Sequence, residues 1–403
     1  MRKFPPINEQ MDLIRRGVDE VISEEKLVQK LESAILLKKP LNVKLGCDPS
    51  RPDLHIGHTV VLRKLRHFQD LGHTAILVIG DFTAMIGDPS GRNKTRPQLS
   101  QEETKEYGQS YVTQASAVLD VEKLRIVYNS EWLSPMNFDD VIRLTSHYTV
   151  ARMLERDDFE KRYKNKVPIS LHEFLYPLAQ AMDSVELKAD VELGGTDQKF
   201  NLLVGRDLQK DYGQDPQIVI TTPLLEGTDG VRKMSKSYDN AIGITEEPQE
   251  MYGKTLSIPD ELIVPYFELA TNISTKDLLG IKSQLESGEN PRNLKRYLAR
   301  VLVTMYHSAV SAQNAEDEFD RIFIKGDEPE VMDEHVISVS PIAILTVLHE
   351  AGLISSKREG RRLIEQGGVK VDGKKINDIN AVIVVKEPRI LRVGKRKFLK
   401  LVP

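Results

Sequence analysis

The stretch NVKLGCDPSRPDLHIGHTVVLRKLRHFQDLGHTAILVIG, residues 42–80, decides the fold class of this chain. Its first six residues read as a strand, and Thr74–Gly80 reads as a second, buried strand. Between them, apolar residues recur at helical spacing from Val60 to Leu71, and Gly72 ends the run. A strand, a helix and a second strand in this order predict a parallel βαβ unit.

Further strand signals extend this unit into a larger sheet. Leu124–Tyr128 and Gln217–Thr222 are short apolar runs, and helical patterns separate the strands along the chain. Strands that alternate with helices are typical of the α/β class, and here they predict a Rossmann-like parallel sheet within residues 1–238. Because ligands of such sheets bind beyond the carboxyl ends of the strands, we expect the functional site at that edge.

The strand signals then fade, and two further domains are expected. Residues 239–330 carry a series of helical patterns and predict an α-helical domain. The acidic, proline-containing stretch Lys325–His335 reads as a linker. Residues 338–403 read as helix, turn, helix and then a hairpin with Asp372-Gly373 at its tip, which predicts a small α+β domain.

The composition excludes several classes of protein. The 403 residues are 40% hydrophobic and 29% charged, and no apolar run approaches the roughly 20 residues that a membrane span needs. The first residues lack the apolar core of a signal peptide. Cys47 is the only cysteine, which excludes an intrachain disulfide and a cysteine-rich zinc site. We therefore expect a cytoplasmic protein without a membrane partner.

Charge is unevenly distributed along the chain. Ser338–Pro403 holds 14 Lys and Arg against 6 Asp and Glu, a balance of +8. Because the whole chain has a formal net charge of −4, the remainder carries −12. A basic tail on an acidic body predicts that the tail binds a polyanion, and a solvated basic face is the alternative.

The segment HIGH, residues 55–58, lies where the loop after the first strand meets the start of the helix. Helix starts expose unpaired backbone N–H groups and bind phosphate. Gly57 lets a base or ribose approach the backbone closely, and the imidazoles of His55 and His58 are suited to donate hydrogen bonds to a triphosphate. The alternative is a surface helix cap with incidental histidines.

A second segment, VRKMSKSYDN at Val231–Asn240, places Lys233 and Lys236 around a Met-Ser pair. A loop of small and polar residues can move, and its two ammonium groups are suited to clamp a leaving pyrophosphate. Alone it reads as a solvated loop, but the two segments together resemble the HIGH and KMSKS signatures of class I aminoacyl-tRNA synthetases. The resemblance implies catalytic roles for His55, His58, Lys233 and Lys236, and ATP contacts for Gly57, Ser235 and Lys236.

A third segment, SLHEFLYPLAQAMDSVEL at residues 170–187, bears on the substrate. It begins with a capping box, and Tyr176, Gln180 and Asp183 share one face of the predicted helix. A core helix with a polar edge is the alternative, but the pattern resembles the substrate helix of tyrosyl-tRNA synthetases. The resemblance implies that Tyr176 and Gln180 hold the ammonium group of tyrosine and that Asp183 accepts the hydrogen of its phenol.

Other segments match the same family. The resemblance implies amino-acid contacts for Asp48 and Asp88, ribose and carboxylate contacts for Gly195, Asp197 and Gln198, and pyrophosphate contacts for Arg92 and Arg96. One position departs from the family pattern. Many members carry Tyr four residues before the Asp of GCDP, where this chain has Lys44. We therefore expect phenol recognition to rest on Asp183 with some other donor.

The resemblance also implies a reaction and its partners. Tyrosine and ATP would form tyrosyl-adenylate and pyrophosphate, and tyrosine would then pass to the 3′-terminal adenosine of a tRNA. Mg²⁺ is expected to enter with ATP rather than to occupy a dedicated protein site. The tail resembles the small alpha-L RNA-binding domain shared with a ribosomal protein. The helical domain is expected to contact the anticodon, and a homodimer is expected.

Three alternative interpretations stay open from the sequence. A tryptophanyl enzyme has the same fold and signatures, although Asp183 and the basic tail favour tyrosine. A non-catalytic RNA-binding protein would not need intact HIGH and KMSKS segments. Another nucleotidyltransferase with a HIGH-like loop would not need the helical domain or the tail.

Overall fold

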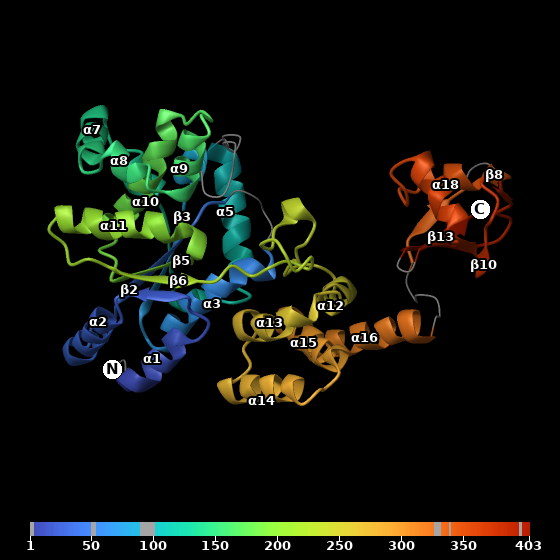
Figure 1. Ribbon diagram of the computed structural model, residues 1–403, viewed down its shortest axis with the longest axis horizontal. Helices are drawn as coiled ribbons and strands as arrows, with labels where there is room; N and C mark the ends of the chain where they lie inside the picture. Colours follow the sequence, from blue (N-terminus) through green and yellow to red (C-terminus); the bar gives the residue numbers. More distant parts are fainter. Residues whose placement is uncertain (1–3, 50–53, 89–100, 326–331, 338–339, 395–396) are drawn as a thin grey trace. The chain divides into compact units, whose positions relative to one another are not determined.

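The computed structural model of the chain describes residues 4–49, 54–88, 101–325, 332–337, 340–394 and 397–403 (Figure 1). These residues form two compact units, 1–312 and 313–403, which are described here one at a time. Arg92 and Arg96, two of the predicted site residues, lie outside the described residues. In the described part of the chain, no helix is both long and apolar enough to cross a membrane.

A six-stranded sheet forms the centre of the first unit. Its strands are β1 (Glu20–Ile22), β2 (Asn42–Cys47), β3 (Thr74–Ile79), β4 (Leu124–Tyr128), β5 (Val191–Gly195) and β6 (Ile218–Thr222). Their order is β1-β6-β5-β2-β3-β4, and all neighbours pair in parallel except β1, which is antiparallel to β6. The predicted Rossmann-like parallel sheet is thereby confirmed. The strand order reverses between β2 and β5, which is where such sheets bind ligands.

Two strands of this sheet were not predicted from the sequence. β5 lies in the centre of the sheet, yet it is five residues long and ends in two glycines, so it lacks a long apolar run. β1 is three residues long and partly buried, which is too short for a periodic signal. The buried strands β2, β3 and β6 carry the runs of Val, Ile and Leu that make parallel strands recognisable.

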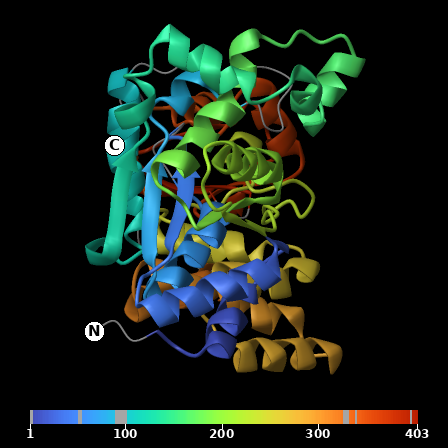
Figure 2. The same ribbon diagram turned by 90° about the vertical axis from the view of Figure 1, so that its left-hand side faces the viewer.

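Helices cover both faces of the sheet. On one face α3 (Ile56–Asp70) packs against β2, β3 and β5, and on the other face α11 (Lys199–Asp211) packs against β5 and β6. α10 (Leu175–Glu186) lies along α11 and is buried on several sides (Figure 1). α5 (Gln101–Ala115) runs beside the ends of β3 and β4, where Gly108 faces Ile79 and Tyr128 (Figure 2).

Further helices complete this part of the first unit. They are α1 (Ile7–Arg15), α2 (Glu24–Leu37), α4 (Thr83–Ile86), α6 (Ser130–Leu133), α7 (Phe138–Ser146), α8 (Val150–Met153) and α9 (Asp157–Lys164). The capping box predicted at the start of the third segment is present. Ser170 and Glu173 each bond the backbone of the other at the 3₁₀ turn Leu171–Phe174, which leads into α10.

The segment after the parallel sheet is helical, as predicted. It forms α12 (Pro248–Leu256), α13 (Ile263–Ala270), α14 (Thr275–Glu286), α15 (Pro291–Tyr306) and α16 (Ala309–Asp320). Of these helices, α15 is anchored to α3: the guanidinium of Arg63 donates to Tyr306 Oη at 2.9 Å, and that hydroxyl donates to Thr59 Oγ1 at 3.1 Å. The helix that begins with HIGH therefore also supports α15.

The tail forms its own α+β core. Helices α17 (Ile344–Glu350) and α18 (Lys357–Glu365) pack with a five-stranded sheet of order β10-β9-β12-β13-β7. Its strands are β7 (Glu334–Val336), β9 (Val369–Val371), β10 (Lys374–Lys375), β12 (Arg389–Val393) and β13 (Lys397–Val402), and β8 (Ile342–Ala343) pairs separately with β11 (Val382–Ile383). The predicted hairpin is confirmed: β9 and β10 pair antiparallel, and the φ angles of Asp372 and Gly373 are 48° and 75°.

The expected linker contributes to this tail sheet. β7 comes from within Lys325–His335 and the following residue, and it pairs in parallel with β13. An acidic stretch with a proline is typical of a linker. A strand of three residues at the edge of a sheet is too short to show the alternating pattern that would have predicted it. The tail sheet thus takes in residues before position 338, where the tail domain was expected to begin.

Candidate functional site

A cavity of about 440 Å³ opens at the carboxyl ends of the parallel strands, a size that suits a small-molecule ligand. Its wall includes the ends of β2, β5 and β6, at Cys47, Gly195 and Thr222. Most predicted site residues line it: Asp48, His55, Gly57, His58, Asp88, Tyr176, Gln180, Asp183, Gly195, Asp197, Gln198, Lys233 and Ser235. Lys236 is close by but does not line it.

The HIGH segment forms the start of α3, as predicted. His55 is the N-cap, its backbone N–H donates to His58 Nδ1 at 3.2 Å, and the two rings stack with centroids 3.7 Å apart. Burial, together with the positive charges of His58 and Lys236, lowers the pKa of His55 to about 2. His55 is therefore a neutral, buried imidazole, which does not fit the alternative of an incidental surface cap.

Gly57 brings the HIGH and KMSKS segments together. A Cβ at Gly57 would lie 3.0 Å from His55 Nδ1 and 3.3 Å from Met234 Cβ, so a larger residue would push the two segments apart. The backbone just after the KMSKS segment also pairs with the HIGH segment, because Ile56 N–H donates to the Ile242 carbonyl oxygen at 2.9 Å. The two signatures thus form one wall of the cavity.

The KMSKS segment is held by its own polar contacts. Lys233 Nζ lies 3.0 Å from Asp197 Oδ2, and Met234 is buried. Ser235 N–H donates to the side-chain oxygen of Asn240 at 2.8 Å, and the Asn240 amide donates to Asp229 at 3.1 Å. Although partial burial opposes it, this bond and further backbone and arginine donors lower the pKa of Asp229 to about 2.

Tyr176 and Asp48 meet at the end of the cavity beside β2. Tyr176 Oη donates to Asp48 Oδ2 at 2.9 Å, and Thr83 Oγ1 donates to Asp48 Oδ1 at 2.7 Å. Gly80 leaves room for these contacts, because a Cβ there would lie 2.1 Å from Asp48 Oδ1 and 2.3 Å from Thr83 Oγ1. This part of the wall is fixed by side chains from three separate segments.

Asp88 and Gln198 belong to a second polar group on the wall. Gln198 Nε2 donates to Asp88 Oδ2 at 3.0 Å, and Arg156 Nη2 donates to Asp88 Oδ1 at 3.2 Å. Arg156 also donates to Asn201 at 3.1 Å, and Asn201 donates to Gln198 at 3.0 Å, so the four side chains close a ring. Neither Arg156 nor Asn201 was predicted: Arg156 lies in no matched motif, and Asn201 ends the matched segment ELGGTDQKFN, in which only Gly195, Asp197 and Gln198 were singled out.

Asp183 lines the cavity and is itself buried. Trp132 Nε1 donates to Asp183 Oδ1 at 2.9 Å. Burial raises the pKa of Asp183 to about 7, although the positive charge of Lys44 and the indole hydrogen bond oppose the shift. Trp132 was not predicted as a site residue from the sequence. The one feature that could have drawn attention to it is that the chain has no other tryptophan.

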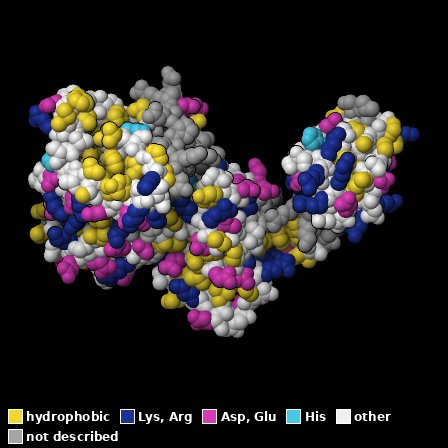
Figure 3. All heavy atoms as spheres, turned by 45° about the horizontal axis from the view of Figure 1, so that its top comes forward, with side chains coloured by type: hydrophobic (Ala, Val, Ile, Leu, Met, Phe, Trp, Pro, Cys, Tyr) yellow, Lys and Arg dark blue, Asp and Glu magenta, His cyan; other side chains and the backbone are white. Residues whose placement is uncertain are grey.

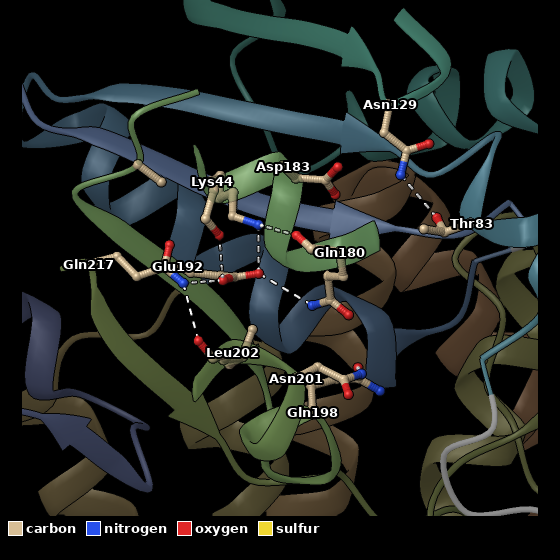
Figure 4. Close-up of polar contacts among 12 residues, drawn as sticks. Lys44, Thr83, Asn129, Gln180, Asp183, Glu192, Gln198, Asn201, Leu202 and Gln217 are labelled. Atoms are coloured by element: carbon tan, nitrogen blue, oxygen red, sulfur yellow. Dashed lines mark hydrogen bonds and ion pairs between the residues drawn. The ribbon is translucent and has the colours of Figure 1, made fainter. Parts of the chain in front are cut away.

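Lys44, the position that departs from the family pattern, is completely buried. Its Nζ donates to Glu192 Oε1 at 2.8 Å, and Gln180 Nε2 donates to the same oxygen at 3.3 Å (Figure 4). Glu192 was not predicted: it begins the matched segment ELGGTDQKFN, in which no role was assigned to this residue.

Comparisons with known proteins agree with this geometry. The family described as "tRNA synthetases class I (W and Y)" matches residues 37–324, and the S4 domain family matches residues 344–383. The chain is 55% identical over 405 residues to a tyrosine–tRNA ligase of Salinibacter ruber, and 57% identical over 399 residues to one of Chlorobaculum tepidum. Each alignment covers 99% of this chain and 98% of the relative.

Solved structures show the same fold at low sequence identity. A tyrosyl-tRNA synthetase of Archaeoglobus fulgidus, solved with L-tyrosine, superposes with a TM-score of 0.63 and 24% identity. The match covers 77% of this chain and 99% of that one.

Proposed function

The chain belongs to the family of class I tRNA synthetases for tryptophan and tyrosine, and from this premise we propose that it is a tyrosine–tRNA ligase. It activates tyrosine with ATP and then transfers it to a tRNA. The observation that carries this proposal is the single cavity in which the HIGH and KMSKS segments face the helix of Tyr176, Gln180 and Asp183.

The first step is an attack of the tyrosine carboxylate on the α-phosphate of ATP. An oxygen–phosphorus bond forms, the bond to the β,γ-pyrophosphate breaks, and tyrosyl-adenylate results. The carboxylate is already ionised at neutral pH, so the step needs neither a general base nor an enzyme nucleophile. The protein contributes positioning and stabilisation of charge on the phosphates.

Stabilisation of the phosphate charge is assigned to the HIGH and KMSKS segments. Neutral His55, together with His58, donates hydrogen bonds to the phosphates, and the ammonium groups of Lys233 and Lys236 draw charge onto the leaving pyrophosphate. We assign Arg92 and Arg96 to the same leaving group from the family resemblance. Gly57, Gly195, Asp197 and Ser235 are assigned to ATP, and Mg²⁺ is expected to enter bound to its phosphates.

Tyrosine is assigned to the buried end of the cavity. Asp88, Tyr176, Gln180 and Gln198 surround its ammonium and carboxylate groups, with Asp48 behind Tyr176. Gln180 Oε1 is buried and has no hydrogen-bond partner among the described residues. Because buried polar atoms are normally hydrogen-bonded, this oxygen is available to accept a hydrogen bond from a ligand. Asp183, oriented by Trp132, accepts the phenol hydrogen.

The second step transfers tyrosine to tRNA. A ribose hydroxyl of the 3′-terminal adenosine attacks the carbonyl carbon of the adenylate, an ester forms and AMP leaves. The tail is assigned to tRNA because it matches the S4 domain and carries a net charge of +8. The helical region that ends at α16 is assigned to the anticodon.

We further propose that the chain functions as a homodimer. Phe138 and Ile142, one turn apart on α7, expose 79% and 52% of their surfaces, and Val150 at the start of α8 exposes 64%. Figure 3 shows hydrophobic side chains gathered on this part of the first unit. Such a patch indicates a protein interface. Light scattering after size exclusion should give twice the mass of one chain, and Phe138→Glu should give monomers.

The test of the activity is ATP–pyrophosphate exchange with each of the twenty amino acids, without tRNA. Exchange with tyrosine alone supports the assignment of the Tyr176–Asp183 helix. Exchange with tryptophan alone would keep the mechanism and overturn the substrate. No exchange with any amino acid would leave a tRNA-binding protein without catalysis. Because its one thiol is consistent with a reducing compartment, we place the activity in the cytoplasm.

A further inference from the structure

An ion pair is buried beneath the substrate helix, between the two strands where the sheet order reverses. Lys44 of β2 and Glu192 of β5 stand directly opposite each other in the parallel ladder. Their side chains are 0% and 1% exposed, and Lys44 Nζ lies 2.8 Å from Glu192 Oε1 (Figure 4). Removing two charges from water is costly, so a pair in this place calls for an explanation.

Both oxygens of Glu192 are occupied by donors. Oε1 accepts from Lys44 Nζ and from Gln180 Nε2, while Oε2 accepts from Ser184 Oγ at 3.2 Å and from Gln217 Nε2. Gly205 in the middle of α11 leaves room for these groups, because a Cβ there would lie 2.8 Å from both Gln217 Nε2 and Ser184 Oγ. The carboxylate is therefore fixed in position from several sides.

A fixed carboxylate sets the orientation of the Gln180 amide. An ionised carboxylate only accepts hydrogen bonds, so the amide nitrogen of Gln180 must face Glu192. The amide oxygen then faces away from it, and this oxygen is the buried atom without a partner among the described residues. Gln180 thus presents its amide oxygen, an acceptor that suits a cation, and not its amide nitrogen, which is a donor.

Lys44 is needed to keep this arrangement. Its ammonium group and the Gln180 amide nitrogen donate to the same oxygen of Glu192. Removal of Lys44 would leave the charge of Glu192 buried without an opposite charge, and the acceptor that orients the Gln180 amide would no longer be held in place. Lys44 Nζ also lies 3.5 Å from the main-chain carbonyl oxygen of Gln180, and Lys44 does not line the cavity. Its influence on a ligand therefore passes through Glu192 and Gln180.

We propose that Lys44 and Glu192 form a positioning pair, which turns the amide oxygen of Gln180 toward the α-ammonium group of the amino-acid substrate. This inference rests on the proposed function, in which Gln180 holds that ammonium group. The pair makes no contact with the reacting atoms, and it acts on affinity for one chemical group of the substrate.

The test replaces both charges at once, because removing one partner leaves a charge buried in the core, whereas apolar replacement of a whole pair is often tolerated. The variant is Lys44→Met with Glu192→Leu. Calorimetry measures its affinity for tyrosine and for 3-(4-hydroxyphenyl)propanoate, which is tyrosine without the amino group. We expect tyrosine to bind on the order of 10- to 100-fold more weakly, as for loss of a hydrogen bond to a charged group, and the amine-free analogue to bind as before.

A matched control removes another buried ion pair of the same unit. Arg162 and Glu173 are 6% and 1% exposed and do not line the cavity. Arg162→Met with Glu173→Leu should leave the ratio of the two affinities unchanged, whatever it does to thermal stability.

The remaining outcomes overturn the proposal. Equal loss of affinity for both ligands would mean that the pair only shapes the pocket. An unchanged affinity for tyrosine would mean that Gln180 is oriented by other means. A collapse of the exchange-rate preference for tyrosine over phenylalanine would place the effect at the phenol. Failure of the wild-type chain to support exchange with tyrosine would instead refute the proposed function itself.

Discussion

The two ends of the cavity are built in opposite ways. At the end that we assign to the amino acid, Tyr176 and Asp183 are 5% and 2% exposed, and each forms a hydrogen bond with a partner from another segment. At the end that we assign to the nucleotide, the side chains of Lys233 and Asp197 are 43% and 27% exposed, and they pair with each other. One end is a fixed set of buried polar groups, and the other is a set of accessible charges on a loop.

The difference matches two different tasks. Discrimination between similar side chains requires buried polar groups that are left unpaired by the wrong ligand, because only an unpaired buried group carries a large energetic penalty. Stabilisation of a leaving pyrophosphate requires cations that can move to charge that develops during the reaction. We expect substitutions at the first end to change selectivity and affinity, and substitutions at the second to change rate.

The largest effect is expected at the exposed end. Lys233→Ala should lower the rate of adenylate formation by about 100- to 1,000-fold, because a cation at the leaving group is lost. The KM for tyrosine should change little, since the tyrosine end is untouched. Pre-steady-state pyrophosphate release measures the rate. Lys282→Ala, an exposed lysine on α14, serves as the control, and parallel losses in tyrosine affinity and rate would contradict the division between the two ends.

The next largest effect is expected at the buried end. Asp183→Asn keeps the shape of the side chain but removes the charged acceptor for the phenol. The preference for tyrosine over phenylalanine, measured as the ratio of kcat/KM in pyrophosphate exchange, should fall by about 10- to 100-fold. A ratio equal to that of the wild-type chain would remove Asp183 from phenol recognition.

The raised pKa of Asp183 predicts a pH dependence for tyrosine. Below pH 7 the free enzyme holds a proton on this carboxyl, which then no longer acts as a pure acceptor. The value of kcat/KM for tyrosine should therefore fall about fivefold as pH decreases from 7 to 6, and should approach a tenfold fall for each further unit. In Asp183→Asn this acid limb should disappear. An acid limb that persists in the variant would assign it to another group.

The smallest effect tests how tightly the buried end is packed. Gly205→Ala places a methyl group against Gln217 and Ser184 and should lower the free energy of unfolding by about 1 kcal/mol, after the gain in helix propensity is counted. Gly280→Ala on α14, where a Cβ meets nothing within 4 Å, should raise it by about 0.5–1 kcal/mol. Urea titration measures the free energy of unfolding of both variants. If both substitutions stabilise the protein, the space around Gly205 is larger than these contacts indicate.

Local patterns predicted the elements with strong periodicity and the residues in contiguous motifs. Strands such as β3, the HIGH and KMSKS segments and the helix of Tyr176 and Asp183 all carry their signal within about ten residues. Their convergence on one cavity follows from the parallel sheet, because the carboxyl ends of its strands share one edge.

The partners of these residues could not be predicted in the same way. Trp132, Arg156 and Glu192 contact Asp183, Asp88 and Lys44 across 51, 68 and 148 positions of sequence. No spacing rule connects segments so far apart, and the contacts arise only when the sheet and its helices are assembled. β5 escaped notice for a related reason, since a short central strand is stabilised by its neighbours rather than by its own apolar residues.

The strand β7 has a practical consequence for work on the tail alone. Asp333 and Ile337 flank β7, and each forms a backbone hydrogen bond of 2.8 Å with β13, at Lys400 and Val402. A fragment that starts at residue 338 would lose these bonds and the buried side chain of Ile337. It would expose β13 as an open edge, a template on which other chains aggregate. A soluble fragment for RNA titrations should therefore begin no later than Asp333.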